Sequence, residues 1–88
     1  MGAYALVLSE AATAALTTAS PGEQRKLLDI LQGLKAAPFR PADLQEPAAD
    51  GRANHVLLVQ DWLLTYWLDH AVCEVRLVRL EQIESKRA

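Results

Sequence analysis

Several residue types are scarce in this sequence, and each shortage excludes a class of protein. The single cysteine, Cys73, cannot form an internal disulfide and cannot hold a zinc ion alone. Gly-rich phosphate loops and Cys-x-x-Cys pairs are absent, and the two histidines show no recognised ligand spacing, so we expect no metal and no cofactor. No apolar run approaches the length of a membrane span, and the beginning of the chain lacks the basic segment of a secretory signal. We therefore expect a cytoplasmic protein that does not enter a membrane.

Basic residues are also not in excess. Nine Lys and Arg stand against eleven Asp and Glu, which gives a net charge of −2. A protein that binds the backbone of a nucleic acid usually carries a basic surplus or a clear basic patch. Positive charge is concentrated only in the last residues, 84–88, which we expect to form a frayed tail. The composition therefore indicates one small globular domain over residues 1–88, without the charge balance typical of nucleic-acid binding.

The second half of the chain holds three apolar runs that favour β-structure. They are Val56–Gln60, Trp62–Leu68 and Val72–Leu80, and no Gly or Pro interrupts them. A helix over the first two runs is disfavoured by their β-branched residues. Turns are expected near Gln60–Asp61 and at Asp69–Ala71. The pattern therefore predicts an antiparallel meander.

The first half of the chain predicts a strand and two helices. Tyr4–Leu8 is a short apolar run, and Ser9 can cap an alanine-rich helix over Glu10–Ala19. The sequence Ser20-Pro21-Gly22-Glu23 is a capping box that starts a second helix, expected to end near Ala36. The apolar face of this helix should comprise Leu27, Leu28, Leu31 and Leu34, with Ile30 at its edge. Residues 37–54, which are rich in proline, are expected to form a loop.

The predicted fold class is therefore α+β, with the element order β-α-α-β-β-β. The helices form a hairpin that packs on one face of a small, four-stranded, antiparallel-rich sheet. On the middle strand of the meander, Leu63 and Trp67 point to the more open face of the sheet. Together they would form an exposed apolar patch and a candidate interaction surface. The alternative, that the loop or the C-terminal tail covers both side chains, stays open.

The order of elements and the run Asp61–Trp67 resemble the RelE/ParE superfamily of toxins from bacterial type II toxin–antitoxin systems. Within that superfamily the sequence is most similar to the YafQ-like branch, in which an Arg and a His precede Asp-Trp-x-Leu-x-Tyr. Here Arg52 and His55 precede the corresponding run. The resemblance implies a RelE-like fold, a cognate antitoxin protein as partner, and either ribosome-dependent mRNA cleavage or ParE-like inhibition of DNA gyrase.

The sequence departs from the family pattern at three places. His55 precedes Asp61 by six residues, whereas the YafQ-like pattern has four. Leu63 occupies the position of an Arg that RelE-type enzymes place three residues before the Tyr. Residues 79–84 carry acidic groups where the nucleases have a glycine and basic residues. These departures indicate a degenerate active site.

RNA cleavage without a metal requires a base, an acid and a cation that stabilises the charge on the phosphorus. His55 could be the base or the acid, Asp61 could orient or accept a proton, and Arg52 could act as the cation. Arg76 and Arg79 could bind the phosphate or RNA. Each residue also has a structural alternative: His55 as a surface residue, Asp61 as a turn residue, and Arg76 in charge pairs with neighbouring carboxylates.

Two functions therefore follow from the sequence. The first is a toxin-like component of a toxin–antitoxin system, at best a metal-independent endoribonuclease and without an intact catalytic site. Its partner would be an antitoxin, and the ribosome with its mRNA or DNA gyrase would be a target only if the protein is active. The second is a non-catalytic protein-interaction module or a small homodimer of the same fold.

Overall fold

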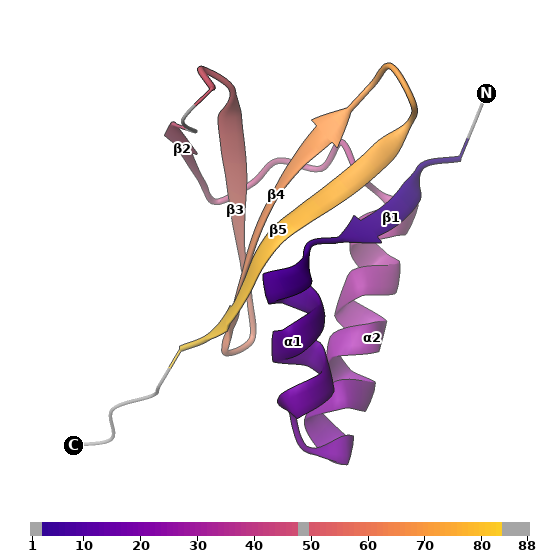
Figure 1. Ribbon diagram of the computed structural model, residues 1–88, viewed down its shortest axis with the longest axis vertical. Helices are drawn as coiled ribbons and strands as arrows, with labels where there is room; N and C mark the ends of the chain where they lie inside the picture. The colour runs from indigo at the N-terminus through magenta and orange to yellow at the C-terminus, as the bar shows by residue number, and fades with distance from the viewer. Residues whose placement is uncertain (1–2, 48–49, 84–88) are drawn as a thin grey trace.

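The protein consists of two layers, a mixed β-sheet and a pair of helices that lie side by side against one of its faces (Figure 1). The computed structural model describes residues 3–47 and 50–83. Its elements are β1 (Ala5–Leu8), α1 (Glu10–Thr18), α2 (Pro21–Ala36), β2 (Leu44–Pro47), β3 (Ala53–Val59), β4 (Trp62–Asp69) and β5 (Glu74–Gln82). The strand order is β1-β5-β4-β3-β2, with β1 parallel to β5 and the other neighbours antiparallel. The predicted α+β fold with a helix hairpin on one face is confirmed. The predicted frayed tail lies outside the described residues.

A fifth strand was missed in the predicted loop over residues 37–54. β2 pairs with the first half of β3 and forms the edge of the sheet, where Pro47 is tolerated because its nitrogen need not donate to a ladder. The Asp43 carboxylate extends this pairing, because its Oδ2 accepts a 2.7 Å hydrogen bond from the backbone nitrogen of Leu58. Four residues without alternating hydrophobicity give little strand signal in the sequence, so the pairing partner alone defines this element.

Both helices begin at the serine residues expected to cap them. The Ser9 hydroxyl accepts from the Ala12 nitrogen at 3.1 Å, and the Ser20 hydroxyl accepts from the Glu23 nitrogen at 3.3 Å. The Glu23 carboxylate has a role that the sequence did not indicate, because its Oε1 accepts from the Trp62 indole nitrogen at 2.9 Å. The first turn of α2 is therefore fastened to the start of β4.

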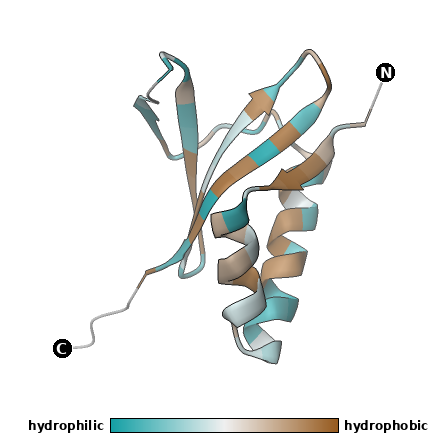
Figure 2. Cartoon of the chain, in the orientation of Figure 1, coloured by the Kyte–Doolittle hydropathy of each residue, from teal (hydrophilic) through white to brown (hydrophobic). Residues whose placement is uncertain are grey.

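The core lies between the helices and the covered face of the sheet. It is built from Ala12, Leu27, Leu31, Leu34, Leu57, Trp62, Leu64, Tyr66, Val75, Leu77 and Leu80. Hydrophobic and hydrophilic residues alternate along β5 as expected for a strand with one covered face (Figure 2). The prediction that Leu28 belongs to the core was wrong, since its side chain is 51% exposed. Leu27, Leu31 and Leu34 already define the buried stripe, and Leu28 points about 100° away from Leu27 on the helix.

The two turns of the meander contain the only non-glycine residues described with positive φ, Gln60 (57°) and Cys73 (54°). The first turn, at Gln60 and Asp61, lies where the sequence predicted it. The second runs over residues 70–73, so that β5 begins at Glu74 and Cys73 is a half-buried turn residue. The expectation that the strand begins at Val72 was therefore wrong, because Val72 and Cys73 both lie in the turn.

A β-bulge in β5 determines which side chains share a face. Thr65 pairs with Arg79 and Tyr66 pairs with Leu77, so Val78 is an additional residue in β5. Because of this residue, Arg76 and Arg79 lie on the same face of the sheet although three positions separate them. The Ser9 hydroxyl donates to the carbonyl of Val78 at 2.6 Å, which connects the bulge to the start of α1.

Across residues 3–47 and 50–83, no helix combines the length and the hydropathy needed to cross a membrane.

Candidate functional site

The face of the sheet opposite the helices, here called the helix-free face, holds all three arginines that the sequence nominated. Trp67 and Thr65 of β4 pair with Arg76 and Arg79 of β5, so these four side chains emerge on one side. Arg52, just before β3, joins them because its guanidinium carbon lies 3.6 Å from the centroid of the Trp67 ring. The nominated cations therefore do form one cluster.

Trp67 is at the centre of this cluster and is half-buried. The guanidinium carbon of Arg76 lies 5.7 Å from the same ring centroid, so the indole is approached by one cation from β5 and one from the segment before β3. Arg52 belongs to the segment that was predicted to be a loop, and its guanidinium covers one side of the Trp67 ring. The indole is therefore less available as an apolar contact than its position in the sequence suggested.

Each of the three arginines forms ion pairs with neighbouring carboxylates. Arg52 pairs with Asp50 at 2.9 Å. Arg76 pairs with Glu74 at 2.6 Å and with Asp69 at 3.4 Å. Arg79 pairs with Glu46 at 2.7 Å and with Glu81 at 3.6 Å, and its Nη2 lies 3.5 Å from the Thr65 hydroxyl. Five carboxylates thus surround three guanidinium groups, so an incoming phosphate would meet a cluster with excess negative charge.

His55 lies on the other face of the sheet. It pairs with Tyr66, the two ring centroids are 5.4 Å apart, and the His55 Nδ1 lies 3.5 Å from the Gln45 Nε2. Since residues that pair across neighbouring strands point to the same side, His55 faces the helix layer together with Tyr66. The structure therefore does not bring His55 to the arginines with which the sequence grouped it.

Asp61 is separated from both groups. It lies in the turn between β3 and β4, where its carboxylate accepts from the Gln82 Nε2 at 3.1 Å and its carbonyl accepts from the Ile83 nitrogen at 2.8 Å. Trp62 and Tyr66 are four residues apart on β4, so the turn is roughly 13 Å along the strand from the level of His55. The three residues nominated for catalysis, His55, Arg52 and Asp61, thus occupy three different places.

Leu63 also lies on the helix-free face, and its cross-strand neighbours are Leu58 and Glu81. Leu58 is 50% exposed and Leu63 is half-buried. The position at which the RelE-type pattern would have an arginine therefore lies between an apolar side chain and a carboxylate. None of these three groups can supply a positive charge to a phosphate.

Sequence reasoning missed the charged groups near Tyr66. Burial raises the pKa of the Tyr66 phenol, the Arg40 guanidinium opposes this rise, and the Asp43 carboxylate adds to it. Arg40 and Asp43 come from the segment between α2 and β2, whose sequence carries no periodic signal. Within the described part of the chain, no group of three or more His, Cys, Asp or Glu side chains forms a candidate metal site.

The pairing of Arg79 with Glu46 and Glu81 leads to a first prediction. The double variant Glu46→Gln/Glu81→Gln should bind a labelled oligouridylate several-fold more tightly than the wild type at low salt, because Arg79 loses both competing carboxylates. The logarithm of its affinity should fall with the logarithm of salt concentration with an added slope of about −0.7, as for one phosphate contact with a single strand. Fluorescence anisotropy at several salt concentrations measures both quantities.

The matched control is Glu10→Gln/Asp29→Asn, which changes the net charge equally but on exposed helix positions. An equal gain in the control would attribute the effect to net charge alone. No gain in either variant would show that the carboxylates are not what keeps Arg79 from phosphate.

Comparison with known proteins gives structural matches only. No protein-family model matches the chain, and no curated protein matches its sequence. Among solved structures, the isolated RelE toxin of E. coli superposes with a TM-score of 0.75 at 16% identity, over 96% of this chain and 88% of that one. The archaeal RelE–RelB complex from Pyrococcus horikoshii contains a chain that superposes with a TM-score of 0.70 at 13% identity. The superposition covers 92% of this chain and 96% of that one.

A third match is to the toxin–antitoxin complex RelBE2 of Mycobacterium tuberculosis, with a TM-score of 0.73 at 16% identity over 93% of each chain. These superpositions span almost the whole of both proteins in every case. The chain described here therefore has the RelE-like fold.

Proposed function

We propose that this protein is the toxin-like component of a type II toxin–antitoxin system, and that it binds an antitoxin protein without cleaving RNA. The fold supports the first part, since two of the similar structures are complexes named for a toxin and its antitoxin or for RelE and RelB. The run Asp61–Trp67 supports a place near the YafQ-like branch of the superfamily.

The observation that carries the second part is the charge arrangement on the helix-free face. Phosphoryl chemistry needs positive charge that is free to stabilise the transition state, together with a positioned acid and base. All three arginines of this face are already paired with carboxylates. The only nominated imidazole near them in sequence, His55, projects from the opposite face. A degenerate nuclease site is the simplest account of this arrangement.

The experiment that tests the proposal is induced expression in a bacterial host, alone and together with the product of the neighbouring gene. We expect the two proteins to co-purify as a complex. We also expect mRNA mapped at nucleotide resolution to show no new cleavage sites, and any effect on growth to be unchanged by His55→Ala or Arg52→Ala. The physical reason is that neither residue has the partners needed for proton transfer or for binding a phosphate.

New mRNA cleavage that disappears in the folded His55→Ala or Arg52→Ala protein would overturn the non-catalytic part. Failure to form any complex with the neighbouring gene product would overturn the toxin-like part.

A second candidate is a homodimer, which is favoured by the adjacent and partly exposed side chains of Leu58 and Leu63. The mass in solution of the protein expressed alone tests this candidate.

A further inference from the structure

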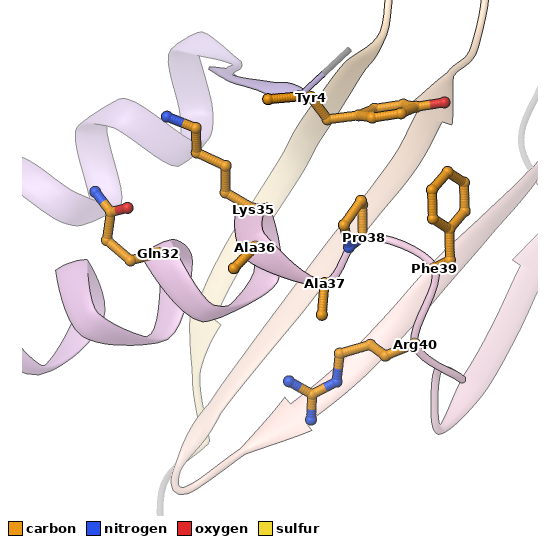
Figure 3. Close-up of a pocket in the computed structure, with 9 residues that line it drawn as sticks. Tyr4, Gln32, Lys35, Ala36, Ala37, Pro38, Phe39 and Arg40 are labelled. Atoms are coloured by element: carbon orange, nitrogen blue, oxygen red, sulfur yellow. The ribbon is translucent and has the colours of Figure 1, made fainter. Parts of the chain in front are cut away.

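A pocket at the C-terminal end of α2 has no role in the site described above. Its volume is about 530 Å³, which is within the range of cavities that hold a ligand or an anchoring side chain. The floor is formed by Ala36, Ala37 and Pro38, and Tyr4 forms part of the wall (Figure 3). We propose that this pocket is the docking site for an acidic peptide segment of a partner protein, which inserts an apolar side chain beside Tyr4 and Phe39.

The aromatic wall of the pocket is built from rings of three separate segments, which contact one another. The Tyr4 and Phe39 rings meet edge to face with centroids 5.3 Å apart, and Phe39 stacks on His70 at 5.9 Å with an interplanar angle of 7°. The Tyr4 hydroxyl and the His70 Nδ1 are 2.7 Å apart. Phe39 is nevertheless 66% exposed, so a fixed aromatic surface is presented to solvent. Such a surface suits an apolar anchor from a partner.

The charge at the rim of the pocket determines the class of partner. Lys35 and Arg40 extend on either side of Ala36 and Ala37 (Figure 3). Among the described residues, neither has a carboxylate within 4.0 Å, whereas every arginine of the helix-free face has at least one. Two unpaired cations beside an apolar floor are complementary to an acidic segment that carries an apolar residue.

The end of the helix favours a peptide over a nucleic acid. The Ala37 nitrogen donates to the carbonyls of Gly33 and Leu34. No backbone N–H of the described residues donates to the carbonyls of Lys35 and Ala36, as is usual for the last turn of a helix. A peptide can donate its own N–H groups to these carbonyls while its carboxylates reach Lys35 and Arg40. A phosphate backbone has no N–H groups to donate to these carbonyls, so it could satisfy only the two cations.

The identification of this partner with an antitoxin rests on the proposed function, but the pocket itself can be tested with a defined probe. The probe is the peptide acetyl-Glu-Glu-Leu-Phe-Glu-Glu-amide, and its counterpart is acetyl-Lys-Lys-Leu-Phe-Lys-Lys-amide. Titration into isotope-labelled protein, followed by amide chemical shifts, gives both affinity and location. We expect only the acidic peptide to bind, with the largest shifts in residues 3–5 and 35–40.

The variant Lys35→Glu/Arg40→Glu should weaken binding of the acidic peptide about tenfold or more, because two attractions become repulsions. Arg25→Glu is the control for a charge reversal outside the pocket, since Arg25 is an exposed cation of the same helix. It changes the net charge half as much as the double variant does and should change the affinity less than twofold. Both variants alter exposed side chains, so their spectra should retain the folded pattern.

Equal binding of the two peptides, or shifts that lie elsewhere, would overturn the proposal. Stronger shifts of the same amides by an oligouridylate would replace it with a nucleic-acid site. The neighbouring gene product separates this proposal from the proposed function. If that protein binds the wild type and the double variant equally, the pocket is not its docking site, while the toxin-like function stands. If the acidic peptide binds but that protein does not, the pocket stands and the toxin-like function fails.

Discussion

Replacing Leu64 by alanine is expected to lower the free energy of unfolding by about 3–5 kcal/mol. Leu64 is 0% exposed and lies on the central strand, with Leu57 and Leu80 directly opposite on its two neighbours. The truncation removes three buried carbon atoms. It leaves a cavity that Leu57 and Leu80, which are held in neighbouring strands, cannot easily fill. Small domains have a total stability of about 5–15 kcal/mol, so this loss should shift the urea midpoint strongly.

The control for this variant is Leu58→Ala, which truncates the same residue type on the helix-free face. Leu58 is half exposed, so its loss should cost less than about 1 kcal/mol. If the Leu64 variant does not fold at all, Leu64→Val gives a graded loss that can be measured in the same way. Equal effects at positions 58 and 64 would contradict the assignment of the covered face.

Replacing Tyr66 by alanine is expected to cost a similar amount, about 3–5 kcal/mol, while Tyr66→Phe should change the stability by less than about 1 kcal/mol. The ring is 1% exposed and belongs to the core, yet its hydroxyl forms no hydrogen bond with another described residue. The ring therefore carries the stabilisation and the hydroxyl contributes little near neutral pH. Urea unfolding of the wild type and both variants measures the two contributions.

The hydroxyl of Tyr66 should become important in alkali. Burial raises its pKa above the ordinary value of 10.0, so the folded state holds the proton more tightly than the unfolded state does. Below a pH of about 10 the phenol is neutral in both states and the stability is fully retained. Stability is then lost as the pH rises through the folded-state pKa, because the unfolded state releases the proton first. The stability of the wild type should therefore fall more steeply in this range than that of Tyr66→Phe. Parallel slopes would show that the phenol titrates equally in both states.

The helices and the meander could be predicted because their signals are local. Ser9 and Ser20 are capping residues that act within their own turn, and the turn at Gln60 and Asp61 is bounded by apolar runs. β2 could not be predicted, since it is held by its pairing with β3 and by the Asp43 carboxylate rather than by its own pattern. Leu28 shows how far helical spacing can predict burial. The spacing identifies the apolar side of the helix but does not show where its buried part ends.

The candidate site was predicted less well than the fold, as His55, the bulge at Val78 and Arg40 show. The alternation of strand side chains places His55 on the face of Leu57 and Val59, away from the arginines, and this could have been read from the sequence. The bulge at Val78 could not have been predicted from the sequence, although it is the reason that Arg76 and Arg79 share a face. Arg40 was missed because the sequence gives no indication that the end of α2 leaves a pocket beside Tyr4.

The parallel pairing of β1 with β5 has a consequence for the synthesis of this protein. Among the described strands β1 lies at the edge of the sheet with β5 as its neighbour, and α1 also contacts β5, so β1 and α1 depend on β5. Ser9 and Val78, which bond across this junction, are 69 residues apart, and the closure of so long a loop is slow relative to local contacts. Until β5 has left the exit tunnel of the ribosome, β1 has no neighbouring strand and α1 lacks most of its contacts. The domain therefore acquires its complete sheet only after β5 has emerged.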